Sequence, residues 1–162
     1  SKNSAADISV LGVIKNKRVW RYISEKYVDK THENIDTWKV LVARVNGAGT
    51  IDEVLSSPLV IGPHCGYTQT FIGVGAFDTK ENAENALKYV KTKFARALLH
   101  VLKVTQDNNR DVWKYVPLQD FTDKSDINWN TSIANIDKQL YKKYGLSQEE
   151  IDFIETHVKE MV

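Results

Sequence analysis

The sequence predicts an α+β fold. The first half of the chain holds β-branched and aromatic runs separated by Gly, Pro and Asn, whereas apolar residues recur at helical intervals in the second half. The strand-like and helix-like halves interleave only once, which is typical of α+β architecture. We therefore expect a small twisted, mainly antiparallel sheet that is packed by one long helix and followed by a C-terminal helical pair.

The N-terminal runs predict the strands of this sheet. Residues 8–14 and 19–23 are apolar or β-rich, and Lys15-Asn16-Lys17-Arg18 between them indicates a hairpin or two linked strands. Residues 24–36 are polar and could hold a short helix. A further strand is expected over residues 38–45, and the glycines at 47 and 49 end it.

Two more strands and the helices follow along the chain. Residues 59–61 and 67–77 predict strands, the second interrupted by a bulge or tight packing at Gly73 and Gly75. Thr79 can cap a helix over residues 80–103, with a break near Lys91 as an alternative. The residues that define the buried side of this helix are Leu87, Val90, Phe94, Leu98 and Val101.

A pair of helices is predicted at the C-terminal end. Ile133, Ile136 and Leu140 give the first an apolar side, and Gly145 suits its C-terminal stop. The sequence Ser147-Gln148-Glu149-Glu150 is a capping-box pattern that begins the second.

Composition limits the class of protein. A chain of 162 residues, 42% hydrophobic and 27% charged, fits one globular domain. No apolar run approaches the roughly 18 residues of a membrane span. Cys65 is the single cysteine, which excludes an internal disulfide and is compatible with a reducing compartment. The N-terminus without Met suggests an excised or processed chain.

Charge is unevenly distributed although the net charge is only +1. Residues 1–50 carry nine Lys/Arg against five Asp/Glu, and residues 86–116 carry seven against two. Residues 51–85 and 117–162 each carry four more acids than bases. Two basic segments beside two acidic ones predict a polarised surface that could face phosphates, or ordinary solvated faces that happen to segregate.

One stretch carries a family resemblance. The run YVKTKFARALLHVLKVTQDNNRDVWKYVPLQDF, from Tyr89 to Phe121, combines with LYKKYGL over residues 140–146 and the following Glu-Glu-Ile. This pattern resembles the C-terminal target-recognition region of bacterial adenine-specific DNA methyltransferases from type II restriction-modification systems, some of which fuse methylase and nuclease. The resemblance is best over residues 38–161, and Ala95 stands where family members often carry Phe.

The resemblance implies a function and its partners. Residues 1–162 would form a single target-recognition domain, the C-terminal fragment of a larger cytoplasmic methyltransferase. Its partners would be double-stranded DNA and the parent's catalytic domain. S-adenosylmethionine would belong to the parent enzyme, and we expect no cofactor and no metal in this fragment.

The sequence lacks the residues that would carry catalysis in this family. The family uses an Asn/Asp-Pro-Pro-Tyr/Phe motif, but Pro58, Pro63 and Pro117 are not adjacent to one another. The Gly73-Val74-Gly75 pair is too short for a cofactor loop, so a bulge is the better interpretation. We therefore expect no catalytic residue in this chain.

Cations on the long helix are the first candidates for DNA binding. Lys93, Arg96, His100 and Lys103 have offsets 0, 3, 7 and 10, which place them on one side of a helix, with Lys91 on its flank. This side could lie along DNA phosphates. It could equally be a solvated face whose stems cover apolar neighbours, or the contact with a missing catalytic domain.

Base reading needs side chains with paired donors and acceptors, and these occur in three apparent loops. The groups are Arg44 with Asn46, then Gln69 between Thr68 and Thr70, and then Gln106, Asn108, Asn109 and Arg110. Each group could also be a turn built from residues that favour turns.

Two alternative functions stay open. A restriction endonuclease that cleaves DNA with a metal would need an acidic cluster, for which Asp52-Glu53 and the Glu25-Lys26 pair are the nearest candidates. A protein-docking module would use the basic helix to bind another protein.

Overall fold

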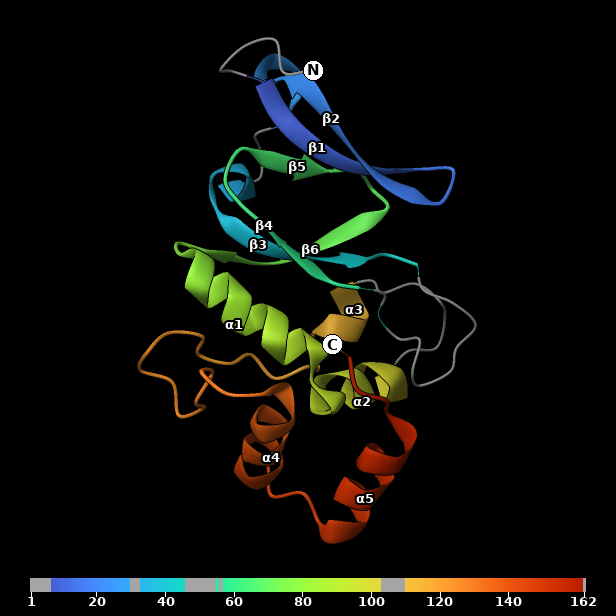
Figure 1. Ribbon diagram of the computed structural model, residues 1–162, viewed down its shortest axis with the longest axis vertical. Helices are drawn as coiled ribbons and strands as arrows, with labels where there is room; N and C mark the ends of the chain where they lie inside the picture. Colours follow the sequence, from blue (N-terminus) through green and yellow to red (C-terminus); the bar gives the residue numbers. More distant parts are fainter. Residues whose placement is uncertain (1–6, 30–32, 46–54, 56, 103–109, 162) are drawn as a thin grey trace.

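The computed structural model describes residues 7–29, 33–45, 55, 57–102 and 110–161. A hairpin sheet, a central sheet and a group of helices are stacked along the molecule in that order (Figure 1). This confirms the α+β class, but the expectation of a single sheet is wrong. The elements are β1 Asp7–Ile14, β2 Lys17–Ser24, 3-10 helices Glu25–Tyr27 and Glu33–Asp36, β3 Trp38–Ala43, β4 Leu59–Ile61, β5 Cys65–Tyr67, β6 Phe71–Phe77, α1 Lys80–Lys91, α2 Lys93–Leu102, α3 Arg110–Trp113, α4 Ile133–Lys143 and α5 Gln148–His157.

The strand predicted over residues 67–77 explains why there are two sheets. A turn divides this segment, because the Phe71 amide donates to the Thr68 carbonyl at 3.0 Å. Before the turn, β5 includes Tyr67, the first residue of the predicted strand, together with Cys65 and Gly66 from the expected connection, and it joins the hairpin sheet in the order β2-β1-β5. The part after the turn, β6, joins the central sheet in the order β4-β3-β6. The strand predicted over residues 67–77 therefore begins in one sheet and continues, after the turn, in the other.

The predicted N-terminal hairpin is confirmed. Ile14 pairs with Lys17, so only Lys15 and Asn16 connect β1 and β2, and both have positive φ angles (50° and 60°). This is the backbone conformation of a tight two-residue hairpin turn. Strand β5 runs parallel to β1 but pairs only with residues 9–11. Beyond Leu11 the hairpin is therefore a two-stranded ribbon.

The bulge expected near Gly73 and Gly75 is also confirmed. Trp38 pairs with Phe77 but Val40 pairs with Val74, so β6 carries one extra residue between these pairs. Gly75 lies in this stretch with φ 73°, a region that favours glycine. A Cβ at Gly73 would lie 2.4 Å from the Tyr67 hydroxyl oxygen, so close packing also requires a glycine there.

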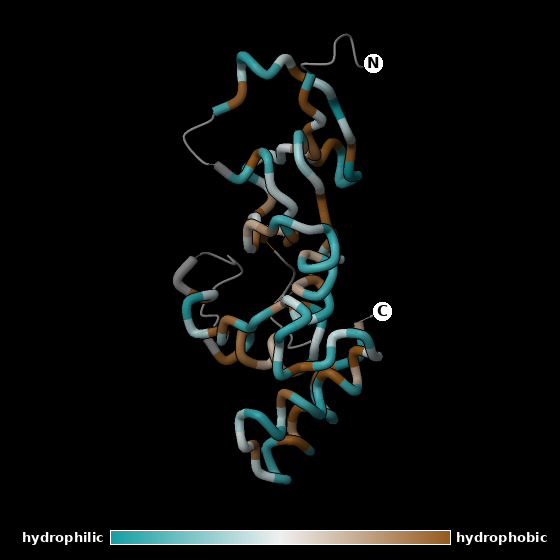
Figure 2. Tube along the Cα trace, turned by 90° about the vertical axis from the view of Figure 1, so that its left-hand side faces the viewer, coloured by the Kyte–Doolittle hydropathy of each residue, from teal (hydrophilic) through white to brown (hydrophobic). Residues whose placement is uncertain are grey.

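The central sheet is buried on both faces. Leu41, Ile61 and Phe71 pack against Leu11 of the hairpin sheet. Val40 and Val42 belong to the larger core, which the helices cover from the other side. Figure 2 shows the elongated molecule from the side, with the hairpin at one end and the C-terminal helices at the other.

The long helix is divided, as the alternative interpretation of the sequence allowed. Thr79 accepts from the Asn82 amide and caps α1, which ends at Lys91. Thr92 then adopts a non-helical conformation. Helix α2 begins with its first amides on Asp137 of α4: Lys93 N donates at 3.1 Å and Phe94 N at 2.9 Å. A carboxylate in this position satisfies amides that would otherwise lack partners.

The C-terminal helical pair has the predicted ends. Gly145 has φ 64°, and the amides of Gly145 and Leu146 donate back to the carbonyls of Lys142 and Tyr141, as in a Schellman motif. Ser147 and Glu150 form the predicted capping box at the start of α5. In the described part of the chain, no helix has the length and apolar character needed to cross a membrane.

Candidate nucleic-acid interface

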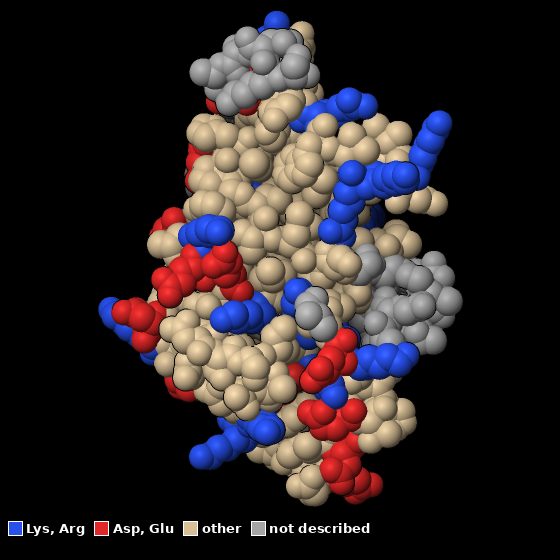
Figure 3. All heavy atoms as spheres, in the orientation of Figure 1, with Lys and Arg blue, Asp and Glu red and all other residues tan. Residues whose placement is uncertain are grey.

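The ribbon formed by β1 and β2 carries a concentration of positive charge. Residues 8–24 contain four Lys/Arg and no Asp/Glu. All four cations are exposed, as is Asn16. We call Lys15, Asn16, Lys17, Arg18 and Arg21 the basic hairpin end. Figure 3 shows Lys and Arg side chains gathered at this end of the hairpin, whereas the acidic side chains in view lie along the left edge and over the helices.

Arg18 attaches the basic hairpin end to the central sheet. Its Nη2 donates to the Ser57 carbonyl at 2.7 Å, and its guanidinium carbon lies 5.6 Å from the centroid of the Phe71 ring. The other three cations form no ion pair with a described residue. Lys15, Lys17 and Arg21 therefore have charges that an anionic partner could approach.

The turn between the two sheets lies next to this end. Gln69 is exposed at its tip, between Thr68 and Thr70, whose hydroxyl oxygens lie 2.7 Å apart. The Thr68 amide donates to the Leu11 carbonyl of β1, and the Arg44 amide donates to the Thr70 carbonyl, both at 3.0 Å. The structure thus brings together two of the three groups that the sequence nominated for base reading, represented by Arg44 and Gln69.

Arg44 and the residues of β6 line part of a groove of about 1350 Å³. Tyr67, Phe71, Trp113 and Leu118 contribute to its lining. The indole N–H of Trp113 is buried and has no hydrogen-bond partner among the described residues. An aromatic surface beside a cation is suited to stacking with planar groups.

Two cations of the expected basic side of the long helix are withdrawn from solvent. Arg96 is 1% exposed; its Nε donates to the Lys91 carbonyl at 3.2 Å and its Nη2 donates to the Lys159 carbonyl. Lys93 forms an ion pair with Glu155 of α5 at 2.6 Å, and its side chain is 13% exposed. The prediction that these two cations face solvent is wrong, because α4 and α5 pack over this side of α2.

The other candidate DNA-binding residues are half-buried or lie, in whole or in part, outside the described structure. Lys91 is half-buried at the end of α1 and lines a cavity of about 220 Å³ together with Arg96 and Asp137. Arg110 begins α3, but its side chain lies outside the described part of the structure. Asn46 and Gln106 also lie outside the described residues, as do Lys103, Asn108 and Asn109.

No arrangement suited to metal-dependent hydrolysis occurs in the described part of the chain, where no three His, Cys, Asp or Glu side chains gather. Asp52 and Glu53 lie outside the described residues. His64 Nδ1 lies 4.0 Å from an oxygen of Asp36, and both side chains are largely exposed.

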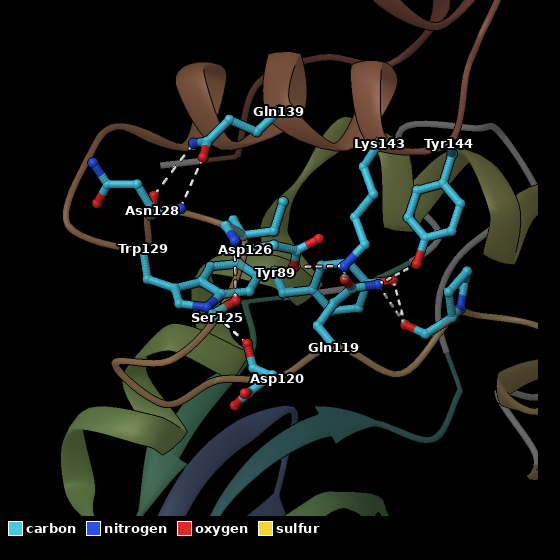
Figure 4. A network of polar contacts seen from close by, with 12 residues as sticks. Tyr89, Gln119, Asp120, Ser125, Asp126, Asn128, Trp129, Gln139, Lys143 and Tyr144 are labelled. Atoms are coloured by element: carbon cyan, nitrogen blue, oxygen red, sulfur yellow. Dashed lines mark hydrogen bonds and ion pairs between the residues drawn. The ribbon is translucent and has the colours of Figure 1, made fainter.

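The two sequence runs that carry the family resemblance meet in space. Gln119 Nε2 donates to the Tyr144 hydroxyl at 2.7 Å, and Lys143 Nζ donates to Gln119 Oε1 at 3.0 Å (Figure 4). Lys143 also pairs with Asp126 at 2.7 Å. Trp129 Nε1 donates to the Asp120 carbonyl at 2.9 Å. These contacts fix the irregular segment 117–130 against α4, so the residues of both runs hold the fold together.

Burial and hydrogen bonding shift the pKa values of groups in the helical half. Burial raises the pKa of Asp137 to about 6, although the amides of Phe94 and Lys93 favour its charged form. Burial also raises the pKa of Tyr141, whose hydroxyl donates to Glu155 at 2.9 Å. Because these groups bind one another and the helix ends, they form a structural cluster.

The hairpin was not among the candidate sites predicted from the sequence, because Lys15–Arg18 fits a simple connection between two strands. A usable signal existed: residues 8–24 have cations and no acids. The alternation of side chains along a strand also places successive cations of β2 on opposite faces.

We compared the chain with known proteins. No family model matches it, and neither a curated protein nor a solved structure matches it.

Proposed function

We propose that this chain is the DNA-recognition domain of an S-adenosylmethionine-dependent adenine DNA methyltransferase in a restriction-modification system, and that it is not catalytic by itself. The supporting observation is the basic hairpin end, which lies next to the turn that carries Gln69 and accepts the Arg44 amide. The choice of methyltransferase rests on the resemblance of residues 89–121 and 140–146 to the target-recognition regions of those enzymes.

This arrangement suits double-stranded DNA for two reasons. Cations that neutralise phosphates release condensed counterions, which drives binding in a salt-dependent manner. Arg and Gln side chains present the paired donors and acceptors that read guanine and adenine edges. Lys15, Lys17 and Arg21 would hold the phosphates, whereas Arg44 and Gln69 would read the bases.

The mechanism is then a division of labour between domains. The parent's catalytic domain would extrude the target adenine and transfer the methyl group to it. The present domain would position the duplex so that one short sequence is presented. This assignment is supported by the separation of the three prolines in the sequence, which leaves no Pro-Pro motif in this chain.

Fluorescence anisotropy with a labelled duplex tests this proposal. The logarithm of the affinity should fall linearly with the logarithm of salt concentration, with a loss of at least tenfold between 50 and 200 mM. Within the parent enzyme, Gln69→Ala should reduce discrimination between cognate and altered duplexes by about tenfold, while Gln148→Ala on exposed α5 should not. Binding that ignores salt, or no binding by the full-length parent, contradicts the proposal.

A docking role for the helical end is the second candidate. Phe94, Leu98 and Leu146 line an apolar groove between α2 and α5, where Val101 is 75% and Phe153 is 52% exposed. We propose that the parent's catalytic domain covers this groove. Co-purification of the separately expressed domains should fail with Phe153→Ser and persist with Lys17→Gln.

Metal-dependent cleavage remains the alternative enzymatic proposal, and Mg²⁺-dependent nicking of a plasmid by the purified chain would establish it.

A further inference from the structure

We infer that the outer edge of β6 is a docking site for an extended peptide segment of a partner protein, which adds to the central sheet as a further strand. The segment alternates apolar and polar side chains and carries a carboxylate near Arg44. This inference concerns a protein partner, and it does not depend on the proposed function in DNA recognition.

The pairing identifies the backbone groups that point outward from β6. The sheet order is β4-β3-β6, so in the described part of the chain β6 pairs on one side only. The Arg44 amide donates to the Thr70 carbonyl, which continues the β3–β6 register as a hydrogen-bonded pair. Because such pairs alternate along an antiparallel ladder, Ile72 and Val74 bond to β3. The N–H and C=O of Gly73 therefore point outward.

The other edge strands of the two sheets have features that discourage further pairing. Strands β4 and β5 have only three residues each, and β2 carries Lys17, Arg18 and Arg21. Short length, charge, proline and bulges are the usual protections of a sheet edge. Strand β6, with the sequence FIGVGAF, has no charge and no proline, and its bulge lies beyond Val74. Residues 71–74 are thus an open template for another strand.

The groove of about 1350 Å³ runs around this edge. Every residue of β6 contributes to its lining. Asn34 and Tyr67 line it on the side of the hairpin sheet, and Tyr89 and Val90 of α1 line it on the side of the helices. Because the central sheet lies between these two parts, a groove that reaches both must pass the edge of β6. Its volume exceeds the roughly 300–1,000 Å³ of small-molecule sites, so it suits a segment of chain.

The lining determines which side chains fit. Val90 and Leu118 are apolar lining residues, and Leu118 is 90% exposed. Asn34 and Thr37, on the side of the hairpin sheet, are polar. Successive side chains of a strand point to opposite faces of the sheet. A strand added to β6 therefore needs apolar side chains toward α1 and polar side chains toward Asn34.

Charge favours a peptide over a nucleic acid in this groove. Arg44 is the only charged residue among the described residues that line it. Its amide bond to Thr70 places it next to the Phe71 end of β6, where a peptide carboxylate would be complementary. A nucleic-acid strand would need several cations for its phosphates. Because the proposed function assigns base reading to Arg44, the variants below leave it unchanged.

Hydrogen exchange with a selected peptide tests the inference. Random octapeptides displayed on phage and selected on the purified chain should converge on alternating apolar and polar residues with an acid near one end. A synthetic copy should increase the protection of the Gly73 amide at least tenfold and change that of Val74, already bonded to β3, less than twofold. No convergence, or a Gly73 amide as protected as Val74 in the free chain, overturns the inference.

Methylation of the peptide backbone distinguishes strand addition from docking by side chains alone. Two versions of the octapeptide are N-methylated on alternate residues, one on odd and one on even positions. Methylation of the amides that face β6 should abolish binding at concentrations up to about 1 mM, whereas the other version should bind within about threefold of the parent peptide. Equal effects of the two versions would mean that no ladder forms.

Leu118→Ser tests the position of the peptide. The side chain is 90% exposed and lines the groove, so its replacement should weaken the peptide about tenfold and leave the circular dichroism spectrum unchanged. Tyr115→Ser is the matched control, because it removes a 60% exposed ring of the same segment that does not line the groove. Loss of affinity with Tyr115→Ser but not with Leu118→Ser places the peptide elsewhere and overturns the inference.

Two other occupants of the edge have their own signatures. Protection of Gly73 that rises with protein concentration in the absence of peptide would assign the edge to a second copy of this chain. Protection by single-stranded oligothymidine and not by peptide would assign it to nucleic acid. Either result overturns the inference. Duplex binding enters none of these measurements, so their failure leaves the proposed function standing.

Discussion

Two arginines illustrate how differently one side-chain type is used in this chain. Arg18 is exposed on the ribbon, where its guanidinium contacts the Ser57 carbonyl and the Phe71 ring. Arg96 is buried, and it ties α2 to the carbonyls of Lys91 and Lys159. Charge alone therefore does not indicate which cation contacts a partner.

We expect Arg96→Ala to destabilise the fold without changing the salt slope of DNA binding. The substitution leaves two carbonyls without their donor and removes a positive charge near Asp137, which should cost about 3 kcal/mol. Urea denaturation measures the loss, and anisotropy on the folded variant measures the slope. Lys17→Gln is the complementary control, because it should lower affinity and leave the free energy of unfolding within about 0.5 kcal/mol of wild type.

Asp137 should give the fold a particular pH dependence. Its pKa in the native state is raised from the ordinary 3.8 to about 6, mainly because burial penalises the charged carboxylate. Between these values the native state binds more protons than the unfolded chain. The contribution of Asp137 to stability is therefore full below pH 3.8 and is lost as the pH rises through 6, by up to about 3 kcal/mol.

The comparison with Asp137→Asn isolates this effect. The free energy of unfolding of wild type relative to the variant should decline as the pH rises from about 4 to about 7. The carboxylates of Asp120, Glu150 and Glu155 have lowered pKa values, so the stability that they give the fold is lost as the pH falls. This effect is the same in wild type and variant and cancels in the difference. If the free energy of unfolding of wild type instead rises with pH relative to that of the variant, Asp137 is preferentially ionised in the native state.

At the scale of elements, the irregular segment between α3 and α4 is held in place by side-chain hydrogen bonds and not by the backbone hydrogen bonds of a helix or sheet. Gln119 is 6% exposed and bonds the Pro117 carbonyl, the Tyr144 hydroxyl and the Lys143 ammonium. Asn85 and Lys88 of α1 donate to the carbonyls of Phe121 and Trp129. Hydrogen bonds from two helices thus replace a helix or strand ladder in residues 117–130.

Substitution of Gln119 should loosen this segment. Gln119→Ala removes three hydrogen bonds, at a cost of about 2 kcal/mol. Hydrogen exchange should increase for the amides of Thr122 and Ile127 more than for those of β1. Gln148→Ala, at an exposed site, is the matched control. An equal increase at Thr122, at Ile127 and in β1 would mean that the segment is not held by Gln119.

At the scale of the whole molecule, the proposed DNA-binding end and the helical end are separate. The ribbon lies at one end of the long axis and α4 and α5 lie at the other (Figure 2). This separation would allow the hairpin to hold a duplex while the helical groove contacts a second domain. Both activities would leave catalysis to the rest of the parent enzyme.

We accordingly expect the purified chain to transfer no methyl group. Incubation with tritiated S-adenosylmethionine and adenine-containing duplexes should give no label in DNA above the level of a heat-denatured control. The full-length parent serves as the positive control. Methyl incorporation by the isolated chain would place the chemistry in this domain and refute the division of labour.

Local sequence patterns predicted most of the secondary structure. The hairpin, the bulge at Gly75, the Thr79 cap and the Ser147 capping box all depend on backbone preferences of a few neighbouring residues. The turn at residues 68–70, within the strand expected over residues 67–77, was missed because Thr68–Thr70 fits a strand by propensity. Long-range bonds to Leu11 and Arg44 decide that these residues turn.

The sequence by itself determined the α+β class, most helix ends and the presence of a cation-rich hairpin without acids, because these depend on neighbours in the chain. Only the tertiary structure decided which cations are exposed. The packing of α4 and α5 against α2 buries Arg96 and pairs Lys93, whereas the short pairing of β5 leaves Lys15 and Lys17 on a projecting ribbon. Burial depends on contacts between residues far apart in sequence, which helical periodicity does not identify.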